Sequence, residues 1–357
     1  MDPSLEISPA ERYSRQLRFA PFGAAGQEKL AQAHAVIVGC GALGSAQAEL
    51  LVRAGIGRLT LIDRDVVEIS NLQRQTLFTE ADALAARPKA LSAQAHLAAI
   101  NSRVEVRALV ADLTPENIAG HLSGASLILD GCDNFETRYL LNDFALAQRR
   151  PWIYAAVEGA YGVSFTIRSG ISACLQCLLG AEPPQADGAC DVAGVLAGAV
   201  RWVAAVQNVE ALKLLSGNDS ALRTTVWRAD LWHNQSRELA APDRQPGCMA
   251  CQGDYRWLRG ESHSQTLTLC GRNAVQIRSP GRSLDLSGLQ LRLHACGRLQ
   301  SSQYLLKFWP HAGTLPAGAT PSETGFELTI FPDGRAIVQG TSDPVLARRI
   351  YAQYLGG

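Results

Sequence analysis

The sequence predicts an α/β fold, a doubly wound and mainly parallel sheet, followed by a smaller α+β domain. Strand-like and helix-like patterns alternate up to residue 157, as in chains whose parallel strands are joined by helices. The strand at 126–130, with the sequence SLILD, is nearly all apolar, which is typical where helices cover both faces of a sheet. At about 150 residues per domain, a chain of 357 residues favours two domains.

The elements of the first region follow in a regular order. A short helix is expected within 11–19, and a strand at 34–39 runs into a glycine-rich turn and a helix over 42–55. Strands follow at 59–63, 104–111, 126–130 and 152–157, and helices at 88–100, 114–122 and 135–148. Extended segments at 161–166 and 222–228 flank a long apolar helix over 193–216, whose Ser216-Gly217 ending is typical of a helix C-cap.

The last hundred residues have a different pattern. Segments 266–278, 289–295 and 304–310 are expected as strands, and a helix is expected over 343–355. Segments 326–331 and 335–340 flank Pro332-Asp333-Gly334, which is a strong hairpin signal. We therefore expect one domain over 1–256 and a small α+β domain of unknown role over 257–357.

Composition excludes several classes of protein. Lys and Arg together number 33, as do Asp and Glu, and this balance disfavours a nucleic-acid-binding surface. The longest apolar candidate for a membrane span, 193–206, contains Arg201, and the acidic first residues lack the apolar stretch of a signal peptide. Nine cysteines are an odd number, which favours reduced thiols or metal ligation over disulfides. We expect a cytoplasmic protein with neither nucleic acid nor membrane as partner.

A glycine-rich turn marks the first candidate site. Gly39, Gly41 and Gly44, with Cys40 and Ala42 between them, follow a strand and open a helix, and Asp63 ends the next strand. In this pattern the glycines bring main chain close to phosphate, the helix N-terminus attracts anions, and the aspartate binds ribose hydroxyls. The motif predicts an adenosine-containing ligand, although a purely structural glycine turn remains the alternative.

Polar and charged residues follow the ends of the neighbouring strands. Because ligands lie outside the carboxyl ends of such strands, these residues are expected to converge on one crevice. Several cations with a carboxylate suit a triphosphate with Mg²⁺ better than a nicotinamide, although Arg74 and Lys89 could also be surface charges. The candidate binding residues beyond the glycine turn and Asp63 are Asp65, Ser70, Asn71, Leu72, Gln73, Arg74, Gln75, Lys89, Asp133 and Asn134.

Two Cys-x-x-Cys pairs form the clearest metal signal. Cys174 and Cys177 form one pair, and Cys248 and Cys251 form the other. Four thiolates predict a closed, structural zinc site. A redox pair is the competing interpretation, but two pairs without a thioredoxin-like context do not favour it.

Five segments together resemble the ThiF/MoeB/HesA family, relatives of the ubiquitin-activating enzymes. In chain order they are ERYSRQ, GCGALG, SNLQRQ, RPKA and DNFETR, and the resemblance extends from residue 11 to about residue 255. The segments LCGRNAVQIR and FPDGRAIVQGT resemble an extension found on some ThiF-type enzymes, which favours the thiamin branch.

The resemblance implies ATP-dependent adenylation of the C-terminal glycine of a ubiquitin-like, ThiS-like sulfur carrier in thiamin thiazole biosynthesis, with release of pyrophosphate. A terminal carboxylate has a pKa of roughly 3.5, so this reaction needs no general base. The resemblance assigns phosphate contacts to Arg74 and Lys89, and to Arg15 reaching across a dimer. It implies that Asp133 binds Mg²⁺ and that Asn71 and Gln75 support the phosphate and ribose contacts.

Cys190 precedes the long helix and, by the same resemblance, receives the activated carrier or takes part in sulfur transfer. A loop cysteine without chemistry is the alternative. The resemblance also implies a homodimer built on the helix over 193–216, and a sulfur donor such as a cysteine desulfurase as a further partner. Arg138 and the loop around Cys190 are candidate walls of the channel for the carrier's tail.

Three other functions stay open. The molybdopterin branch would use the same chemistry on a MoaD-like carrier. An NAD-binding oxidoreductase would use the glycine turn but would need neither Arg74 nor Lys89. A non-catalytic module that keeps the nucleotide fold is disfavoured by the complete set of phosphate-binding residues.

Overall fold

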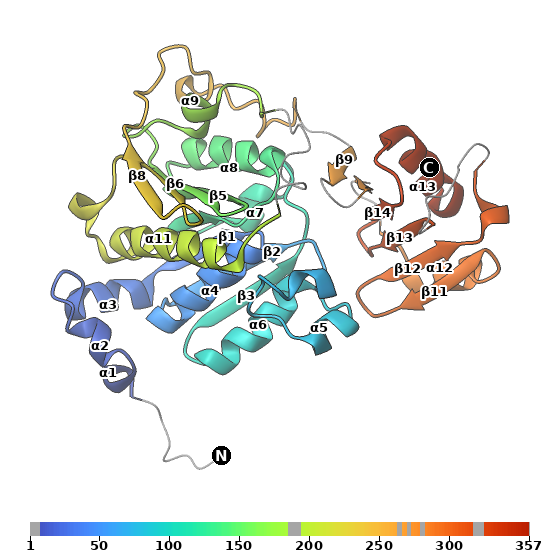
Figure 1. Cartoon of the computed structure of the whole chain (residues 1–357), viewed down its shortest axis with the longest axis horizontal. Helices are drawn as coiled ribbons and strands as arrows, with labels where there is room; N and C mark the ends of the chain where they lie inside the picture. The colour runs from blue at the N-terminus through green and yellow to red at the C-terminus, as the bar shows by residue number, and fades with distance from the viewer. Residues whose placement is uncertain are drawn as a thin grey trace. The chain divides into compact units, whose positions relative to one another are not determined.

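The computed structural model describes residues 8–184, 194–262, 266–269, 273–278, 283–316 and 325–356. The described residues form two compact units (Figure 1). The first contains the described residues up to 184 and 195–262, and the second contains Gly194 and those from 266 onward. Every helix in these described ranges is too short or too polar to span a bilayer.

The first unit is built on one eight-stranded sheet with the order β3-β2-β1-β4-β5-β6-β7-β8. The strands from β3 to β5 are parallel, and β5 to β8 pair in antiparallel fashion. The predicted doubly wound, mainly parallel fold is therefore confirmed. The strands are β1 His34–Val38, β2 Arg58–Asp63, β3 Glu105–Val110, β4 Leu127–Asp130, β5 Trp152–Glu158, β6 Tyr161–Ile167, β7 Val226–Asp230 and β8 Gln235–Leu239.

Helices cover both faces of this sheet (Figure 1). Alternate residues of a strand point to opposite faces, so Val36 and Val38 enter one core while Ala35 and Ile37 enter the other. The first face carries α7 Ile118–His121, α8 Phe135–Ala147 and α9 Leu175–Leu179. The second carries α3 Gly23–Gln32, α4 Ala42–Ala54, α6 Lys89–Ile100 and α11 Ala197–Ser216. Short elements complete the unit: α1 Pro9–Arg12, α2 Ser14–Leu17, η1 Ile69–Asn71, α5 Glu80–Leu84, η2 Asp219–Ala221 and η3 Ala250–Gln252.

Several predicted elements are shorter than expected. The helix expected within 11–19 appears as α1 and α2, separated at Tyr13, and that expected over 114–122 is reduced to α7. In the latter, the Asn117 side chain accepts from Thr114 N and donates to Asp112 O, so a side-chain turn replaces the first helical turn. The long helix begins at Ala197 rather than 193, and β7 begins at Val226 rather than 222.

The second unit is an antiparallel six-stranded sheet with the order β11-β12-β13-β14-β10-β9. Two helices contribute Leu289, Leu293 and Ile350 to its core. The expected hairpin is present, because β13 and β14 pair on either side of Pro332-Asp333-Gly334. The elements are β9 Thr266–Leu269, β10 Ala274–Ile277, α12 Leu286–Leu293, β11 Gly297–Ser301, β12 Leu306–Pro310, η4 Ala312–Thr314, β13 Glu327–Ile330, β14 Ala336–Gln339 and α13 Pro344–Leu355.

One predicted strand is wrong. Residues 289–295 were expected to be extended, but most of this segment belongs to α12. The Asp285 carboxylate accepts from Ser287 N and caps the helix, while Leu289 and Leu293 lie one turn apart and are buried. Leu291 is 82% exposed, as expected for the opposite side of a helix. The sequence LQLRLHA also fits the two-residue period of a strand, so periodicity could not separate the two structures.

Candidate nucleotide crevice and cysteine cluster

The glycine turn after β1 depends on close contact between main-chain segments. Gly39 has φ +87°, and a Cβ there would lie 2.3 Å from Gly131 O. A Cβ on Gly44 would lie 1.8 Å from Gly39 O, so only glycine lets α4 start so close to the turn. At Gly41 a Cβ would meet only Gln75 Nε2, at 3.9 Å. No side chain caps the start of α4, whose first residue is Ala42, so main-chain N–H groups there can receive an anion.

Asp63 ties the glycine turn to the end of β2. Its Oδ2 accepts from Cys40 N at 2.6 Å, and its Oδ1 accepts from Asp65 N at 2.6 Å. Burial raises the pKa of this carboxyl, the Lys89 ammonium opposes the shift, and Asp65 adds to it. Asp63 therefore shapes the turn as well as being available at the carboxyl edge of the sheet.

Lys89 is buried near the carboxyl end of β2 and is not a surface charge. Its side chain is buried, and its Nζ lies 3.0 Å from Asp65 Oδ2. The main chain holds it there, because Lys89 N donates to Asp65 O and Val67 N donates to Arg87 O. A buried ammonium at the end of the strands is well placed to receive a phosphate oxygen.

Two other predicted binding residues have polar atoms that are buried without a partner. Asn71 Nδ2 and Gln75 Oε1 make no hydrogen bond to the residues that the structure describes. An unsatisfied buried polar atom costs about 1–3 kcal/mol, so these two atoms are candidates for hydrogen bonds to a bound ligand. Arg74, next to Gln75, is half-buried and donates from Nη1 to Ser70 O. Ser70, Leu72 and Gln73 lie in the same turn.

The loop after β4 contains Asp133 and Asn134. Asn134 Oδ1 accepts from Thr137 N and caps α8, and its Nδ2 donates to Asp133 Oδ1 at 3.3 Å. Asp133 itself is exposed at the carboxyl edge of the sheet. Asn134 is thus a helix cap that also contacts the predicted Mg²⁺ ligand.

A buried ion pair fixes this loop, and sequence reasoning missed it. Arg138 Nε donates to Asp130 Oδ2 at 3.0 Å, and Asp130 Oδ1 accepts from Cys132 N. Arg138 Nη2 donates to Cys132 O and Ala155 O. We expected Arg138 to be a channel wall, but only 6% of it is exposed. An aspartate ending an apolar strand, with an arginine eight residues later in the first turn of the next helix, is the signal that could have revealed the pair.

Arg15 lies away from the crevice of its own chain. It is exposed on α2, and the neighbouring Gln16 donates from Nε2 to Ala54 O, at the end of α4. The glycine turn is at the other end of this 13-residue helix, about 20 Å away at 1.5 Å per residue. Cys190, the remaining predicted catalytic residue, lies outside the described residues.

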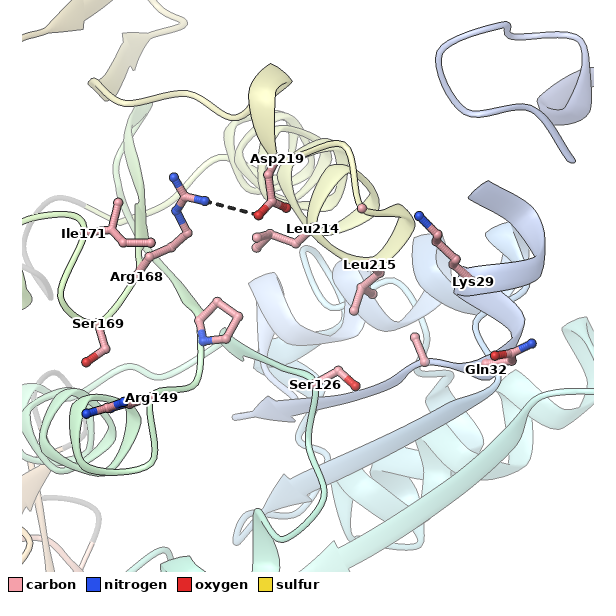
Figure 2. Close-up of a pocket in the computed structure, with 13 residues that line it drawn as sticks. Lys29, Gln32, Ser126, Arg149, Arg168, Ser169, Ile171, Leu214, Leu215 and Asp219 are labelled. Atoms are coloured by element: carbon pink, nitrogen blue, oxygen red, sulfur yellow. Dashed lines mark hydrogen bonds and ion pairs between the residues drawn. The ribbon is translucent and has the colours of Figure 1, made fainter. Parts of the chain in front are cut away.

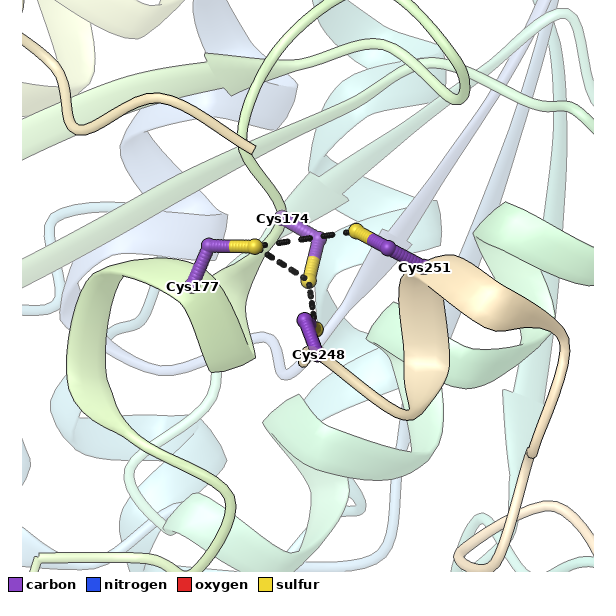
Figure 3. Close-up of side chains that lie close together, drawn as sticks. All are labelled: Cys174, Cys177, Cys248 and Cys251. Atoms are coloured by element: carbon purple, nitrogen blue, oxygen red, sulfur yellow. Dashed lines mark hydrogen bonds between the residues drawn. The ribbon is translucent and has the colours of Figure 1, made fainter. Parts of the chain in front are cut away.

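The four predicted metal ligands lie together (Figure 3). Sγ–Sγ distances are 3.7 Å for Cys174–Cys177, 3.5 Å for Cys174–Cys248 and 3.6 Å for Cys177–Cys251. Four sulfurs at about 2.3 Å from a tetrahedral zinc ion are roughly 3.8 Å apart, so the arrangement fits such an ion. Burial raises the pKa of Cys174, and that of Cys248 to about 11, so a bound cation would be needed to hold them as thiolates.

Asp143 of α8 supports the cluster from the side. Its carboxylate accepts from Gln176 Nε2, between the first two cysteines, and from Trp257 N, beyond the last two. Burial raises its pKa to about 6. The cluster therefore links the segment after β6 to the segment after β8 and to the face of the sheet covered by α8.

Comparison with known proteins gives one family. The model of the ThiF family matches residues 13–250. A Bacillus subtilis (strain 168) protein named sulfur carrier protein ThiS adenylyltransferase is 42% identical over 349 residues, covering 97% of this chain and 99% of its own. The chain belongs to the ThiF family.

A Thermus thermophilus sulfur carrier protein adenylyltransferase is 37% identical over 247 residues, which are 68% of this chain and 90% of the relative. Among solved structures, E. coli MccB with ATP has a TM-score of 0.59 at 22% identity, covering 68% of this chain and 74% of that chain. The structural match shows a shared fold. The ThiF family membership predicted from the five motifs is confirmed.

Proposed function

We propose that this chain is an ATP-dependent adenylyltransferase that activates the C-terminal glycine of a ubiquitin-like sulfur-carrier protein of the ThiS type, for thiamin thiazole biosynthesis. The observation that carries the proposal is the 42% identity to a ThiS adenylyltransferase over 97% of the chain, the last hundred residues included. The relative of similar activity from Thermus aligns with only 68% of the chain. Identity across the full length therefore favours the ThiS type over a MoaD-like carrier.

The chemistry requires alignment and charge neutralisation. One oxygen of the carrier's terminal carboxylate attacks the α-phosphorus of ATP, the bond to the β-phosphate breaks, and pyrophosphate leaves with that electron pair. The carboxylate is already ionised near neutral pH, so no proton is removed. The product is a mixed anhydride of the glycine and AMP. What remains for the protein is to hold both groups in line and to offset the charge of the phosphates.

The crevice residues fit these tasks. In the proposal, the glycine turn and the N-terminus of α4 receive the phosphates, Lys89 and Arg74 offset their charge, and Asp63 binds the ribose. Asn71 Nδ2 and Gln75 Oε1, which have no partner among the described residues, would then form hydrogen bonds to the nucleotide. Asp133 offers an exposed carboxylate of the kind Mg²⁺ prefers, and the ion would neutralise charge on the triphosphate. The ion pair of Asp130 and Arg138 keeps the Asp133 loop in place.

The proposal includes a homodimer in which Arg15 of each chain serves the partner's crevice. The position of α2 near the far end of α4 supports this, because Arg15 is about 20 Å too far along the helix to serve its own glycine turn. Exposed Trp202 and Val209 on α11 are consistent with a contact between chains. Mixing Arg15→Ala chains with Lys89→Met chains tests this, since only hybrid dimers would regain one working site.

The other parts of the proposal concern the cysteines and the domains. A Zn²⁺ ion held by Cys174, Cys177, Cys248 and Cys251 would be structural, because all four positions are protein ligands. Residues 1–256 would form the adenylation domain and 257–357 a separate domain. Cys190 would carry the activated carrier or its sulfur, with a cysteine desulfurase as donor, in the reducing cytoplasm. Cys190→Ala with unchanged sulfur transfer would contradict that role.

ATP–pyrophosphate exchange by the purified chain tests the proposed function. Three reactions are compared: no carrier, a ThiS-like carrier and a MoaD-like carrier. Exchange only with the ThiS-like carrier is expected. Exchange only with the MoaD-like carrier would keep the chemistry and overturn the branch. Absence of exchange in all three reactions would overturn the function itself.

A further inference from the structure

Two glutamines are buried between α4 and α11, behind the nucleotide crevice. Gln47 belongs to α4 and Gln207 to α11, and neither residue is exposed to solvent. Gln47 Nε2 donates to Gln207 Oε1 and, at 2.9 Å, to Asp130 O. Gln207 Nε2 donates to the same main-chain oxygen at 3.3 Å and to Ile153 O, in β5, at 3.2 Å. Two helices therefore hold the last residue of β4 by its carbonyl group.

Packing alone does not explain this glutamine pair. The same two helices bury apolar residues against each other, among them Ala46, Val203 and Ala204. Gln47 Oε1 is buried and has no partner among the described residues, which lowers stability, whereas methionine would fill a similar volume without that penalty. What glutamine offers and methionine lacks is a directed hydrogen bond. The pair is therefore best understood through the group that it holds.

Asp130, the residue that the glutamines hold, leads into the loop that contains Asp133. The Asp130 carboxylate accepts from Arg138 Nε and from Cys132 N, inside that loop. Arg138 comes from α8 on one face of the sheet, and the glutamines come from α4 and α11 on the other. The side chain and the main chain of Asp130 are thus fixed from opposite faces, three residues before Asp133.

The loop after β4 touches the glycine turn directly beside the held residue. A Cβ on Gly131 would lie 2.3 Å from Gly39 O and 3.0 Å from Gly44 Cα, so the two main-chain segments are in contact there. The turn has a support of its own, because Asp63 Oδ2 accepts from Cys40 N. Loss of the glutamine contacts should therefore shift the loop relative to the turn, and the turn itself should stay in place.

The position of the Asp133 side chain depends on this loop. Asp133 is exposed, so packing against the core does not fix its carboxylate. Its Oδ1 accepts from Asn134 Nδ2, but Asn134 belongs to the same loop. A carboxylate held in this way can meet a metal ion at a defined place only if the main chain that carries it is held.

We propose that Gln47 and Gln207 are positioning residues, which hold the loop of Asp133 where its carboxylate can bind the Mg²⁺ of Mg²⁺–ATP. This inference rests on the proposed function, since it takes ATP and Mg²⁺ as ligands of the crevice. Residues that orient a metal ligand without touching the metal typically contribute about 10–100-fold to metal affinity. The glutamines should therefore affect the binding of Mg²⁺–ATP much more than the binding of metal-free ATP.

Equilibrium binding of an ATP analogue with a methylene group between its α- and β-phosphates tests this inference. The affinity is measured with Mg²⁺ and with a chelator, and the ratio of the two affinities is the Mg²⁺ factor. Gln207→Met and Gln47→Met keep the side-chain volume but remove the donors, and each should lower the Mg²⁺ factor about tenfold. Asp133→Asn removes the proposed ligand itself and should give the lowest factor. Metal-free binding should change little in all three variants.

Asn208→Leu is the matched control. Asn208 follows Gln207 on α11, is 8% exposed and also carries an amide, but it forms no hydrogen bond to Asp130. Its variant should keep the Mg²⁺ factor of the parent chain, whatever happens to its melting temperature. Melting temperatures are measured for all variants, because a purely structural role of the glutamines would lower the melting temperature and leave the Mg²⁺ factor unchanged.

Three results would overturn the inference: a parental Mg²⁺ factor in the glutamine variants, an equal fall in Asn208→Leu, or a parent chain whose affinity does not respond to Mg²⁺. If one glutamine variant does not fold, the other decides. ATP–pyrophosphate exchange by the parent chain keeps the two proposals apart. Exchange together with one of these three results would overturn the inference alone, whereas a parent chain that neither binds the analogue nor catalyses exchange would overturn the proposed function as well.

Discussion

The four-cysteine cluster and the nucleotide crevice are both assembled from distant segments of one unit, yet they differ in what is already in place. The cluster brings four sulfurs within 4.8 Å of one another in the arrangement a tetrahedral ion requires. The crevice has a fixed frame, built on main-chain contacts at Gly39 and Gly44 and on the ion pair of Lys89 and Asp65. Its proposed ligand-facing side is unfinished, because Asn71 Nδ2 and Gln75 Oε1 have no partner among the described residues and Arg15 lies far away.

This difference fits what each site is proposed to do. A structural ion stays bound and holds the fold, so its ligands must be close in every molecule. A site that binds and releases a nucleotide and the tail of a carrier needs a rigid frame with polar groups that find their partners only in the complex. Disrupting the cluster should therefore affect stability first, whereas substitutions in the crevice should separate catalysis from folding to different degrees.

Loss of the metal should have the largest effect. Cys248→Ser removes one of four ligands, and we expect a loss of more than about 4 kcal/mol in unfolding free energy, together with the bound zinc. Elemental analysis of the purified protein and chemical denaturation measure both quantities. Cys296→Ser is the control, because Cys296 is half-buried outside the cluster. A Cys248→Ser protein that keeps its zinc and its stability would show that the four sulfurs do not act as one site.

The next effect is expected at Lys89. Lys89→Met should lower ATP–pyrophosphate exchange by about 10²–10³-fold, because it removes the buried cation proposed to contact the triphosphate. It should also reduce stability by about 3 kcal/mol, since Asp65 loses its ion pair with Lys89. Exchange is therefore measured under conditions in which circular dichroism shows that the variant is folded. Arg53→Met, which breaks only the exposed pair with Glu49, should leave both quantities nearly unchanged. Normal exchange in Lys89→Met would remove Lys89 from the site.

The frame of the crevice can be tested without changing any charge. In Gly44→Ala the new methyl group would lie 1.8 Å from Gly39 O, so the turn or α4 must shift, and we expect a loss of about 3 kcal/mol in unfolding free energy. Gly120→Ala is the matched control, because a Cβ there meets no atom within 4 Å. Equal stability of the two variants would mean that the turn is not the rigid part of the crevice.

The features that sequence predicted well are those encoded in short segments. The glycine turn, the two cysteine pairs and the hairpin at Pro332-Asp333-Gly334 each combine a local pattern with a known backbone geometry. Alternation of strands and helices likewise predicts a mainly parallel sheet with helices on both faces, since right-handed crossovers leave few topologies. These predictions needed no knowledge of which distant residues would meet.

The features that sequence did not predict depend on packing between distant segments. The ion pair of Arg64 and Asp112, with Arg64 Nη1 at 2.9 Å from Asp112 Oδ1, joins two segments 48 residues apart and has no signature in either of them. The helix α12 was mistaken for a strand because its leucines fit both periods, and burial against the second sheet decides the outcome. A hollow lined by Lys29, Arg149 and Arg168 is likewise formed by chain segments that meet only in the fold (Figure 2).

Substitution of Asp82, which contacts the segment leading to Lys89, should have the smallest effect. Its carbonyl accepts from Arg87 N, just before Pro88-Lys89, and its carboxylate accepts from Thr79 N and lies 2.8 Å from His96 Nε2. Burial opposes ionisation of Asp82, but the hydrogen bonds from His96 and Thr79 outweigh it and lower its pKa to about 2.

A folded-state pKa below the unfolded value means that the charged carboxylate stabilises the fold above about pH 4 and that this stabilisation is lost as pH falls towards 2. At pH 6 the free energy of unfolding of Asp82→Asn should thus be about 2 kcal/mol lower than that of the parent chain. This difference should shrink below pH 4. Denaturation at several pH values measures it, with Glu80→Gln on the exposed side of the same helix as control. If Lys89 depends on this support, the variant should also bind ATP more weakly. Unchanged ATP binding would mean that the contacts with Asp65 are enough to hold Lys89 in place. Asp82 would then stabilise the fold without helping to position Lys89.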